Sequence, residues 1–130
     1  MRFYLWSVAL AAALIYLPYL VVATGRVKVG YDLSAPRRML DRLPGWAQRA
    51  TWAHQNALES FPIFAAAVFA AMLARVPEAQ AILPLGLYLG ARTLYPLFYI
   101  LDWPILRAAM FASGSAAIAL LFIAAIQAVS

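Results

Sequence analysis

The run FYLWSVALAAALIYLPYLVVA, from Phe3 to Ala23, contains no charged residue. The hydrocarbon core of a bilayer is about 30 Å thick, and roughly 20 helical residues at about 1.5 Å each are needed to cross it. The run therefore predicts a membrane-spanning helix. It is longer than the apolar region of a signal peptide, which has about 7–15 residues, so we expect a retained helix rather than a cleaved leader.

Three further apolar runs of sufficient length follow at about residues 50–74, 80–101 and 105–128. Two short polar connections, Arg75–Glu78 and Asp102–Pro104, separate them. Such short connections predict that neighbouring helices are antiparallel. Prolines inside the runs predict kinked helices whose freed carbonyl groups are satisfied by neighbouring helices, and hence a packed bundle.

The composition of the 130 residues agrees with a membrane protein. Hydrophobic residues make up 66% of the chain and charged residues 12%, whereas soluble domains have about 45–50% and about 25%. The absence of cysteine excludes disulfides, cysteine-based metal sites and a cysteine nucleophile, and one histidine is too few for a histidine-rich metal site. The sequence predicts an all-α integral membrane four-helix bundle with a single domain over residues 1–130.

The polar segment at about residues 25–48 is the longest in the chain and is strongly basic. It holds the cations Arg26, Lys28, Arg37, Arg38 and Arg42 and the acids Asp32 and Asp41. Cytoplasmic loops carry an excess of Lys and Arg, so we predict that the first and third loops are cytoplasmic and the termini outside. The bacterial inner membrane is the expected location, since no eukaryotic sorting signal is present. The net charge of +5 indicates contact with anionic lipid or an anionic ligand rather than nucleic acid.

Polar residues also occur inside the apolar runs, where a charge costs at least about 2.5–3.5 kcal/mol near the bilayer centre. They follow one helical face of the second run and one of the third, and Arg107 begins the fourth. The set is Arg49, Trp52, Asn56 and Glu59, then Arg92, Tyr95 and Tyr99, then Arg107. We predict that three helices direct these groups to one site in the cytoplasmic half of the bundle, with Arg92 contacting Glu59.

Structural roles are the alternative for the same residues. A contact between Arg92 and Glu59 can simply fix the register of two helices. Tyr95 and Tyr99 are also typical of membrane interfaces. His54 is interpreted as a packing or headgroup-level residue rather than a base.

Two stretches carry a family pattern. The second run contains Ala53-His-Gln-Asn56-Ala-Leu-Glu59-Ser-Phe-Pro62-Ile-Phe64, and the third contains Arg92-Thr-Leu-Tyr95-Pro-Leu-Phe-Tyr99. Together with a basic residue at the start of the fourth run, they resemble the MAPEG family, the membrane-associated proteins in eicosanoid and glutathione metabolism. Four spans, a polar first loop and the total length agree, so the resemblance covers essentially the whole chain.

The resemblance implies a homotrimer that binds glutathione between subunits on the cytoplasmic side. It implies that Asn56 and Glu59 contact the peptide and amino group of glutathione. Arg92, Tyr95 and Tyr99 are implied as contacts from the neighbouring subunit, and Arg107 as the residue that stabilises the thiolate. A hydrophobic electrophile or lipid peroxide would arrive from the membrane, and the reaction would be conjugation or peroxide reduction.

The chain also departs from the family pattern. Trp52 stands where some members have an Arg, and Arg49, one turn earlier, is the nearest cation that could replace it. Ala108 follows Arg107 where a Ser is found in some members. A non-catalytic lipid-binding or scaffold member of the family is therefore one alternative. A small proton-coupled exporter is another, although such exporters carry their Glu in the first span.

Overall fold

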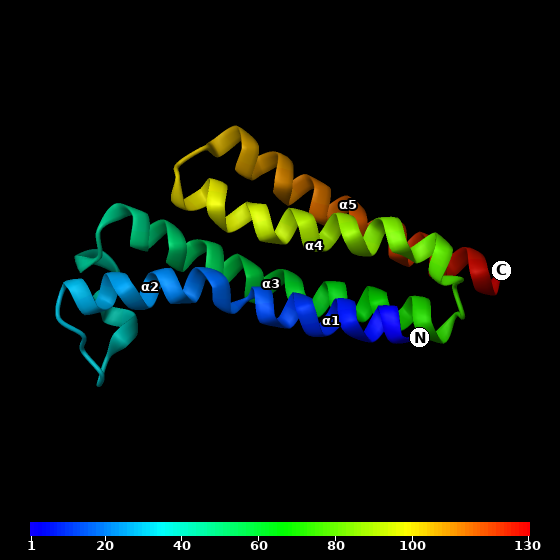
Figure 1. The fold of residues 1–130 in the computed structure, drawn as a ribbon, viewed down its shortest axis with the longest axis horizontal. Coiled ribbons are helices and arrows are strands. Elements are labelled where there is room, and N and C mark those ends of the chain that lie inside the picture. Colours follow the sequence, from blue (N-terminus) through cyan, green and yellow to red (C-terminus); the bar gives the residue numbers. More distant parts are fainter.

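Four helical segments are long and apolar enough to cross a membrane. The first consists of α1 (Arg2–Leu14) and α2 (Tyr16–Lys28), and the others are α3 (Gly45–Leu73), α4 (Glu78–Ile100) and α5 (Pro104–Val129). The computed structural model describes residues 1–130 and contains no strand (Figure 1). The chain is an all-α integral membrane protein with the predicted four-helix bundle.

The first span is interrupted at Ile15, three residues before Pro18, and continues to Lys28, beyond the predicted end at Ala23. Pro18 has no backbone N–H and therefore weakens the helix at this point. The Nδ1 atom of His54, on α3, lies 2.9 Å from the carbonyl oxygen of Ile15. The imidazole ring also packs 5.3 Å from the ring of Tyr19. A neighbouring helix thus satisfies a carbonyl group at the interruption, which gives His54 a packing role.

In both short connections the preceding helix ends at a residue with a positive φ angle. After α3, the N–H of Val76 donates to the Ala71 carbonyl over 3.0 Å, and Arg75 adopts a left-handed conformation with φ 56°. After α4 the equivalent residue is Asp102, with φ 61°. This helix ending usually uses glycine, because a side chain disfavours positive φ. The antiparallel helix pairs predicted from the short connections are confirmed (Figure 1).

The register of α3 against α4 is set by a buried contact in the middle of the bundle. The rings of Phe64 and Tyr88 stack with their centroids 3.7 Å apart. The hydroxyl oxygens of Ser60 and Tyr88 are 3.2 Å apart, so the phenol is also hydrogen-bonded. Buried residues of α1 and α5 complete the same core.

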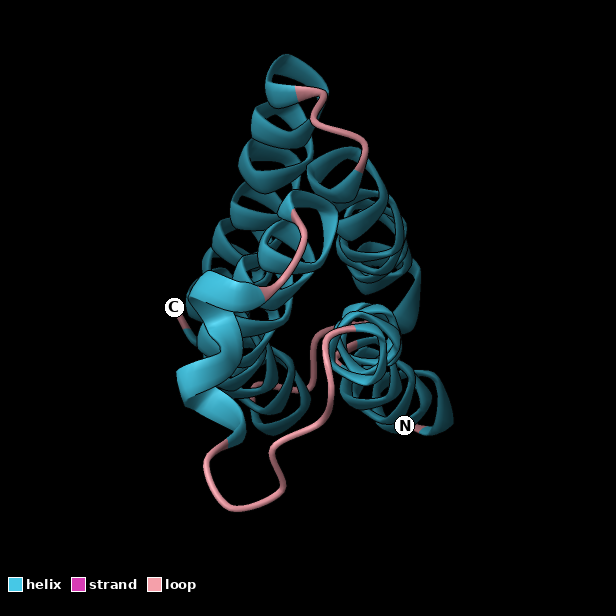
Figure 2. Cartoon of the chain, turned by 90° about the vertical axis from the view of Figure 1, so that its left-hand side faces the viewer, coloured by secondary structure: helices cyan, strands magenta, loops and turns pink.

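The basic segment between the first two spans is more ordered than a simple polar loop. It contains the 3-10 helix η1 (Pro36–Arg42), which lies beside the start of α3 (Figure 2). Upstream of η1, the carboxylate of Asp32 accepts hydrogen bonds from the N–H groups of Ser34 and Ala35. Met39 of η1 is 1% exposed, so η1 is anchored by a buried side chain.

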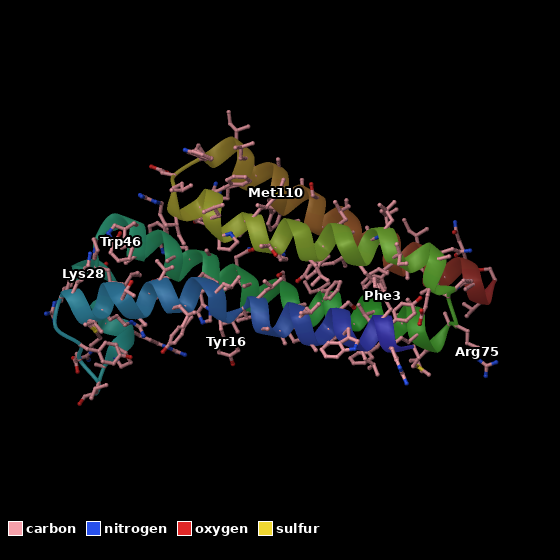
Figure 3. All side chains as sticks on the ribbon, in the orientation of Figure 1. Phe3, Tyr16, Lys28, Trp46, Arg75 and Met110 are labelled. Atoms are coloured by element: carbon pink, nitrogen blue, oxygen red, sulfur yellow. The ribbon has the colours of Figure 1, made fainter.

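The two ends of the bundle differ in charge. Lys28 and Trp46 lie at one end, together with η1 and the α4–α5 turn, and Arg75 lies at the other with both termini (Figures 1 and 3). At the latter end the N-terminal ammonium forms an ion pair with Glu78. At the former, Lys28 Nζ lies 5.3 Å from the ring centroid of Trp46.

Gly25 allows a close approach between α2 and α3. A Cβ atom at Gly25 would lie 2.5 Å from the Cβ of Ala47, so both backbones would have to move. We expect Gly25→Ala to lower the free energy of unfolding by about 1–3 kcal/mol, the usual effect of overpacking. Thermal unfolding of the detergent-purified protein measures this effect.

Gly86→Ala is the matched control for this change. A Cβ atom at Gly86 would meet no atom within 4 Å inside the chain. Ala is a better helix former than Gly by about 1 kcal/mol, so this variant should be as stable as the wild type or slightly more stable. Equal unfolding temperatures for the two variants would show that α2 and α3 are not in close contact at Gly25.

Candidate functional site

Polar side chains of α3 and α4 face each other toward the end of the bundle that carries the α4–α5 turn. The Nη1 atom of Arg92 donates a hydrogen bond to Oδ1 of Asn56 over 2.7 Å. Nearer the turn, Nε of Arg49 donates to the carbonyl oxygen of Ile100 over 3.1 Å. These two bonds follow the register set by the Tyr88 contact, so the predicted faces of the two helices do meet.

Arg92 is a buried cation, with a relative exposure of 6%. Its guanidinium carbon lies 5.4 Å from the ring centroid of Tyr88 and 5.5 Å from that of Tyr95. Its Nε atom is buried and has no hydrogen-bond partner. Gly114 of α5 lies beside the guanidinium, since a Cβ atom at this position would be 3.5 Å from Nε, which is an ordinary van der Waals contact.

The predicted contact between Arg92 and Glu59 is wrong. The only ion pairs in the chain join the N-terminus to Glu78 and Arg49 to Asp102. Glu59 lies three residues beyond Asn56, about 4.5 Å further along α3, and its side chain is exposed. The amide of Asn56 satisfies one guanidinium nitrogen without the desolvation of a second charge. The carboxylate of Glu59 consequently has no hydrogen-bond or ion-pair partner within the chain.

An aromatic group links α3, α4 and α5. The rings of Tyr95 and Tyr99 are arranged edge to face, with centroids 5.6 Å apart, and the ring of Trp52 lies 6.3 Å from that of Tyr99. The guanidinium carbon of Arg107 is 4.5 Å from the centroid of the Tyr99 ring. Residues from three helices therefore gather around these two tyrosines.

Arg49 contacts the C-terminal end of α4 and not the groups around Arg92. Besides its bond to the Ile100 carbonyl, its Nη1 atom lies 3.8 Å from Oδ2 of Asp102. A cation at the C-terminal end of a helix stabilises the last carbonyl groups, and Arg49 does this for α4. Its predicted contact with a ligand carboxylate would have to compete with these two contacts.

The family pattern noted in the sequence is independently supported. The sequence model of the MAPEG family matches residues 3–127. The chain belongs to the MAPEG family. The match spans all four membrane helices and includes every residue of the polar site. No curated protein matches the chain. The MAPEG family includes glutathione transferases and peroxidases as well as other members.

The site of this MAPEG chain offers groups that suit a small zwitterionic ligand. Arg92 and Arg107 carry N–H donors that no acidic side chain of the chain neutralises, and guanidinium groups bind carboxylates in a forked geometry. Glu59 is a free carboxylate for an ammonium group. The phenols of Tyr95 and Tyr99 are both donors and acceptors. The combination of free cations with one free carboxylate fits a peptide with charges of both signs.

Proposed function

We propose that this MAPEG chain is a glutathione-dependent membrane transferase or peroxidase that acts on a hydrophobic electrophile. The observation that carries the proposal is Glu59, an exposed carboxylate without a partner in a membrane-spanning helix. Ionisable groups in membrane spans are costly and normally pair with something. The partner of Glu59 must therefore come from outside the chain, and an ammonium group is the natural one.

The remaining groups fit the rest of glutathione, which carries one ammonium, two carboxylates and a thiol. Arg92, with its free Nε, and the Asn56 amide would hold the peptide, and Tyr95 and Tyr99 would orient it. When bound, glutathione supplies a thiol nucleophile. Arg107 is free of acidic partners, and a cation near a thiol lowers the thiol pKa by about 1–3 units.

We further propose a homotrimer in which a neighbouring subunit completes the site, since Glu59 and Trp52 face outward from the single chain. The end with η1 and the α4–α5 turn is proposed to be cytoplasmic, in the bacterial inner membrane. Seven of the ten Lys and Arg residues belong to this end, which the positive-inside rule assigns to the cytoplasm. The hydrophobic substrate would enter from the surrounding lipid.

A non-catalytic lipid-binding member of the family is the second candidate. Trp52 is 41% exposed and lies beside Tyr99. The site therefore has an apolar surface at the position where a cation would be needed to bind a carboxylate of glutathione. Arg49, the nearest substitute, is held at the end of α4. Ala108 brings no hydroxyl group next to Arg107. These three residues favour a lipid ligand over glutathione.

Thermal unfolding with glutathione and with S-hexyl glutathione distinguishes the two candidates. A ligand that binds only the folded state raises the unfolding temperature. The transferase or peroxidase proposal expects stabilisation by both ligands, with a larger shift for S-hexyl glutathione because its alkyl group occupies the site of the hydrophobic substrate. Stabilisation by neither ligand, in a correctly assembled oligomer, would support the lipid-binding candidate instead.

The Glu59→Gln variant tests the observation on which the proposal rests. A hydrogen bond to a charged group contributes about 1.5–3 kcal/mol, so we expect glutathione affinity to fall roughly 10- to 150-fold. The unfolding temperature without ligand should stay the same or rise, because an unpaired charge leaves the membrane span. Isothermal titration of the detergent-purified oligomer measures the affinity.

Glu78→Gln is the control, since the Glu78 carboxylate pairs with the N-terminal ammonium at the opposite end of the bundle. Its glutathione affinity should equal that of the wild type. Unchanged affinity in Glu59→Gln as well would remove Glu59 from the ligand site.

A further inference from the structure

A separate pocket lies between α2, η1 and α3, on a different face of α3 from the polar site. Its volume is about 540 Å³. Arg26 and Arg37 line it together with apolar side chains such as Tyr19 and Leu58. None of the residues assigned above to glutathione lines this pocket.

The cations of the pocket are not neutralised within the chain. The Arg26 side chain makes no hydrogen bond or ion pair, its Nε atom is buried without a partner, and its guanidinium carbon lies 5.9 Å from the ring centroid of Tyr31. Arg37 likewise forms no ion pair. Asp32 forms no ion pair, and its Oδ1 atom accepts hydrogen bonds from the N–H groups of Ser34 and Ala35. A buried guanidinium nitrogen without a partner is costly, and an anion would remove that cost.

The cations of the pocket lie at one end of it. Arg26 and Tyr19 are seven residues apart on α2, which corresponds to about 10 Å. Leu58 follows Thr51 by the same distance on α3, which runs antiparallel to α2, and both residues line the pocket. The two arginines therefore lie near the basic end of the bundle. Tyr19 and Leu58 lie deeper in the membrane span, where the uncharged polar side chains of His54 and Gln55 also line the pocket.

We propose that this pocket binds an anionic phospholipid. Arg26 and Arg37 would hold the phosphate, because guanidinium groups bind phosphate oxygens in pairs. The glycerol and the first part of an acyl chain would lie along Tyr19 and Leu58. Inorganic phosphate would bind the same guanidinium groups, but it has no acyl chain to contact Tyr19 and Leu58 and should therefore bind more weakly. The proposal does not depend on the proposed glutathione chemistry, since the two sites share no residue.

Binding of dioctanoyl phosphatidylglycerol to the detergent-purified protein tests the proposal. We expect saturable binding of this lipid, and no binding of dioctanoyl phosphatidylcholine or inorganic phosphate at the same concentrations. Arg26→Gln should weaken binding at least about fivefold, the effect of one cation near anionic lipid. Arg38→Gln removes the same charge from an exposed residue outside the pocket and should leave binding unchanged.

Four results would overturn the proposal. Absence of saturable phosphatidylglycerol binding, or equal weakening by Arg26→Gln and Arg38→Gln, would leave only general attraction to a basic surface. Equal binding of inorganic phosphate would indicate a simple anion site. Displacement of the lipid by glutathione would make the pocket part of the peptide site.

A second variant keeps the test valid if Arg26→Gln does not fold. Leu58→Trp fills the deeper end of the pocket without changing its charge, because Leu58 is 49% exposed and lines that end. This variant should weaken phosphatidylglycerol binding and leave stabilisation by glutathione unchanged. Unaltered lipid binding would contradict the placement of the acyl chain.

Discussion

Arg92→Leu is expected to abolish most of the glutathione affinity while leaving the fold intact. The lost charge-assisted hydrogen bonds correspond to about 1.5–3 kcal/mol, or roughly 10- to 150-fold in affinity. The unfolding temperature should change little, because two effects oppose each other. Asn56 loses its partner at 2.7 Å, but a buried cation is replaced by an apolar side chain, which is often neutral or stabilising. Calorimetric titration and thermal unfolding of the same sample measure both quantities.

Two further variants separate a ligand role from a purely structural one. Arg92→Lys keeps the charge but lacks the forked geometry, so its affinity should lie between those of the wild type and Arg92→Leu. The double variant Arg92→Leu/Asn56→Leu removes both partners, so it should be at least as stable as the wild type and still fail to bind. If Arg92 only fixes the helix register, Arg92→Leu will instead unfold readily and retain its glutathione affinity when folded.

The number and order of the spans were predictable because each is a long apolar run between short polar connections. The direction of the polar faces was predictable for the same physical reason, since residues three or four apart share one side of a helix. The interruption near Pro18 was expected from the proline, but the residue that satisfies the carbonyl group there was not, because helical periodicity does not show which neighbour supplies the donor. That donor is His54, 39 residues away from Ile15 in sequence.

The partner of Arg92 illustrates what helical periodicity leaves undetermined. Asn56 and Glu59 lie on the same face of α3, so periodicity alone allows either to meet α4. The choice depends on how far α3 is shifted along α4, and the stacked Phe64 and Tyr88 rings set that shift. Charge complementarity favoured Glu59, whereas the packing of two aromatic rings selects Asn56.

The basic segment was interpreted from its charges as a signal for membrane orientation. That interpretation treats the cations alike and gives no reason to separate Arg26 from Arg38. The difference arises from three-dimensional structure, because η1, anchored by buried Met39, lines the same pocket as α2 and α3. Arg26 is thereby enclosed in a pocket, whereas Arg38 remains exposed.

Arg107→Leu is expected to remove the thiolate form of bound glutathione. A free thiol has a pKa near 8.5, and a nearby cation lowers it by about 1–3 units, which raises the thiolate fraction at pH 7 to between about a quarter and nearly all of the bound glutathione in the proposed complex. Without the cation the pKa of the bound thiol returns toward its ordinary value, and only about 3% is thiolate at pH 7. Ultraviolet difference absorbance of the glutathione complex between pH 5 and 9 follows the thiolate directly.

The position of Arg107 over Tyr99 makes this test specific. Because its guanidinium carbon lies 4.5 Å from the Tyr99 ring and forms no ion pair, the residue is held by an aromatic face that leaves its N–H groups free for an anion. Arg107→Lys should retain most of the thiolate signal, since the charge is kept. Tyr99→Phe should also retain it, because the ring remains, whereas Tyr99→Leu should weaken it by releasing the guanidinium. An unchanged signal in Arg107→Leu, with glutathione still bound, would mean that another group stabilises the thiolate, and the conjugation rate would then be equally insensitive to this residue.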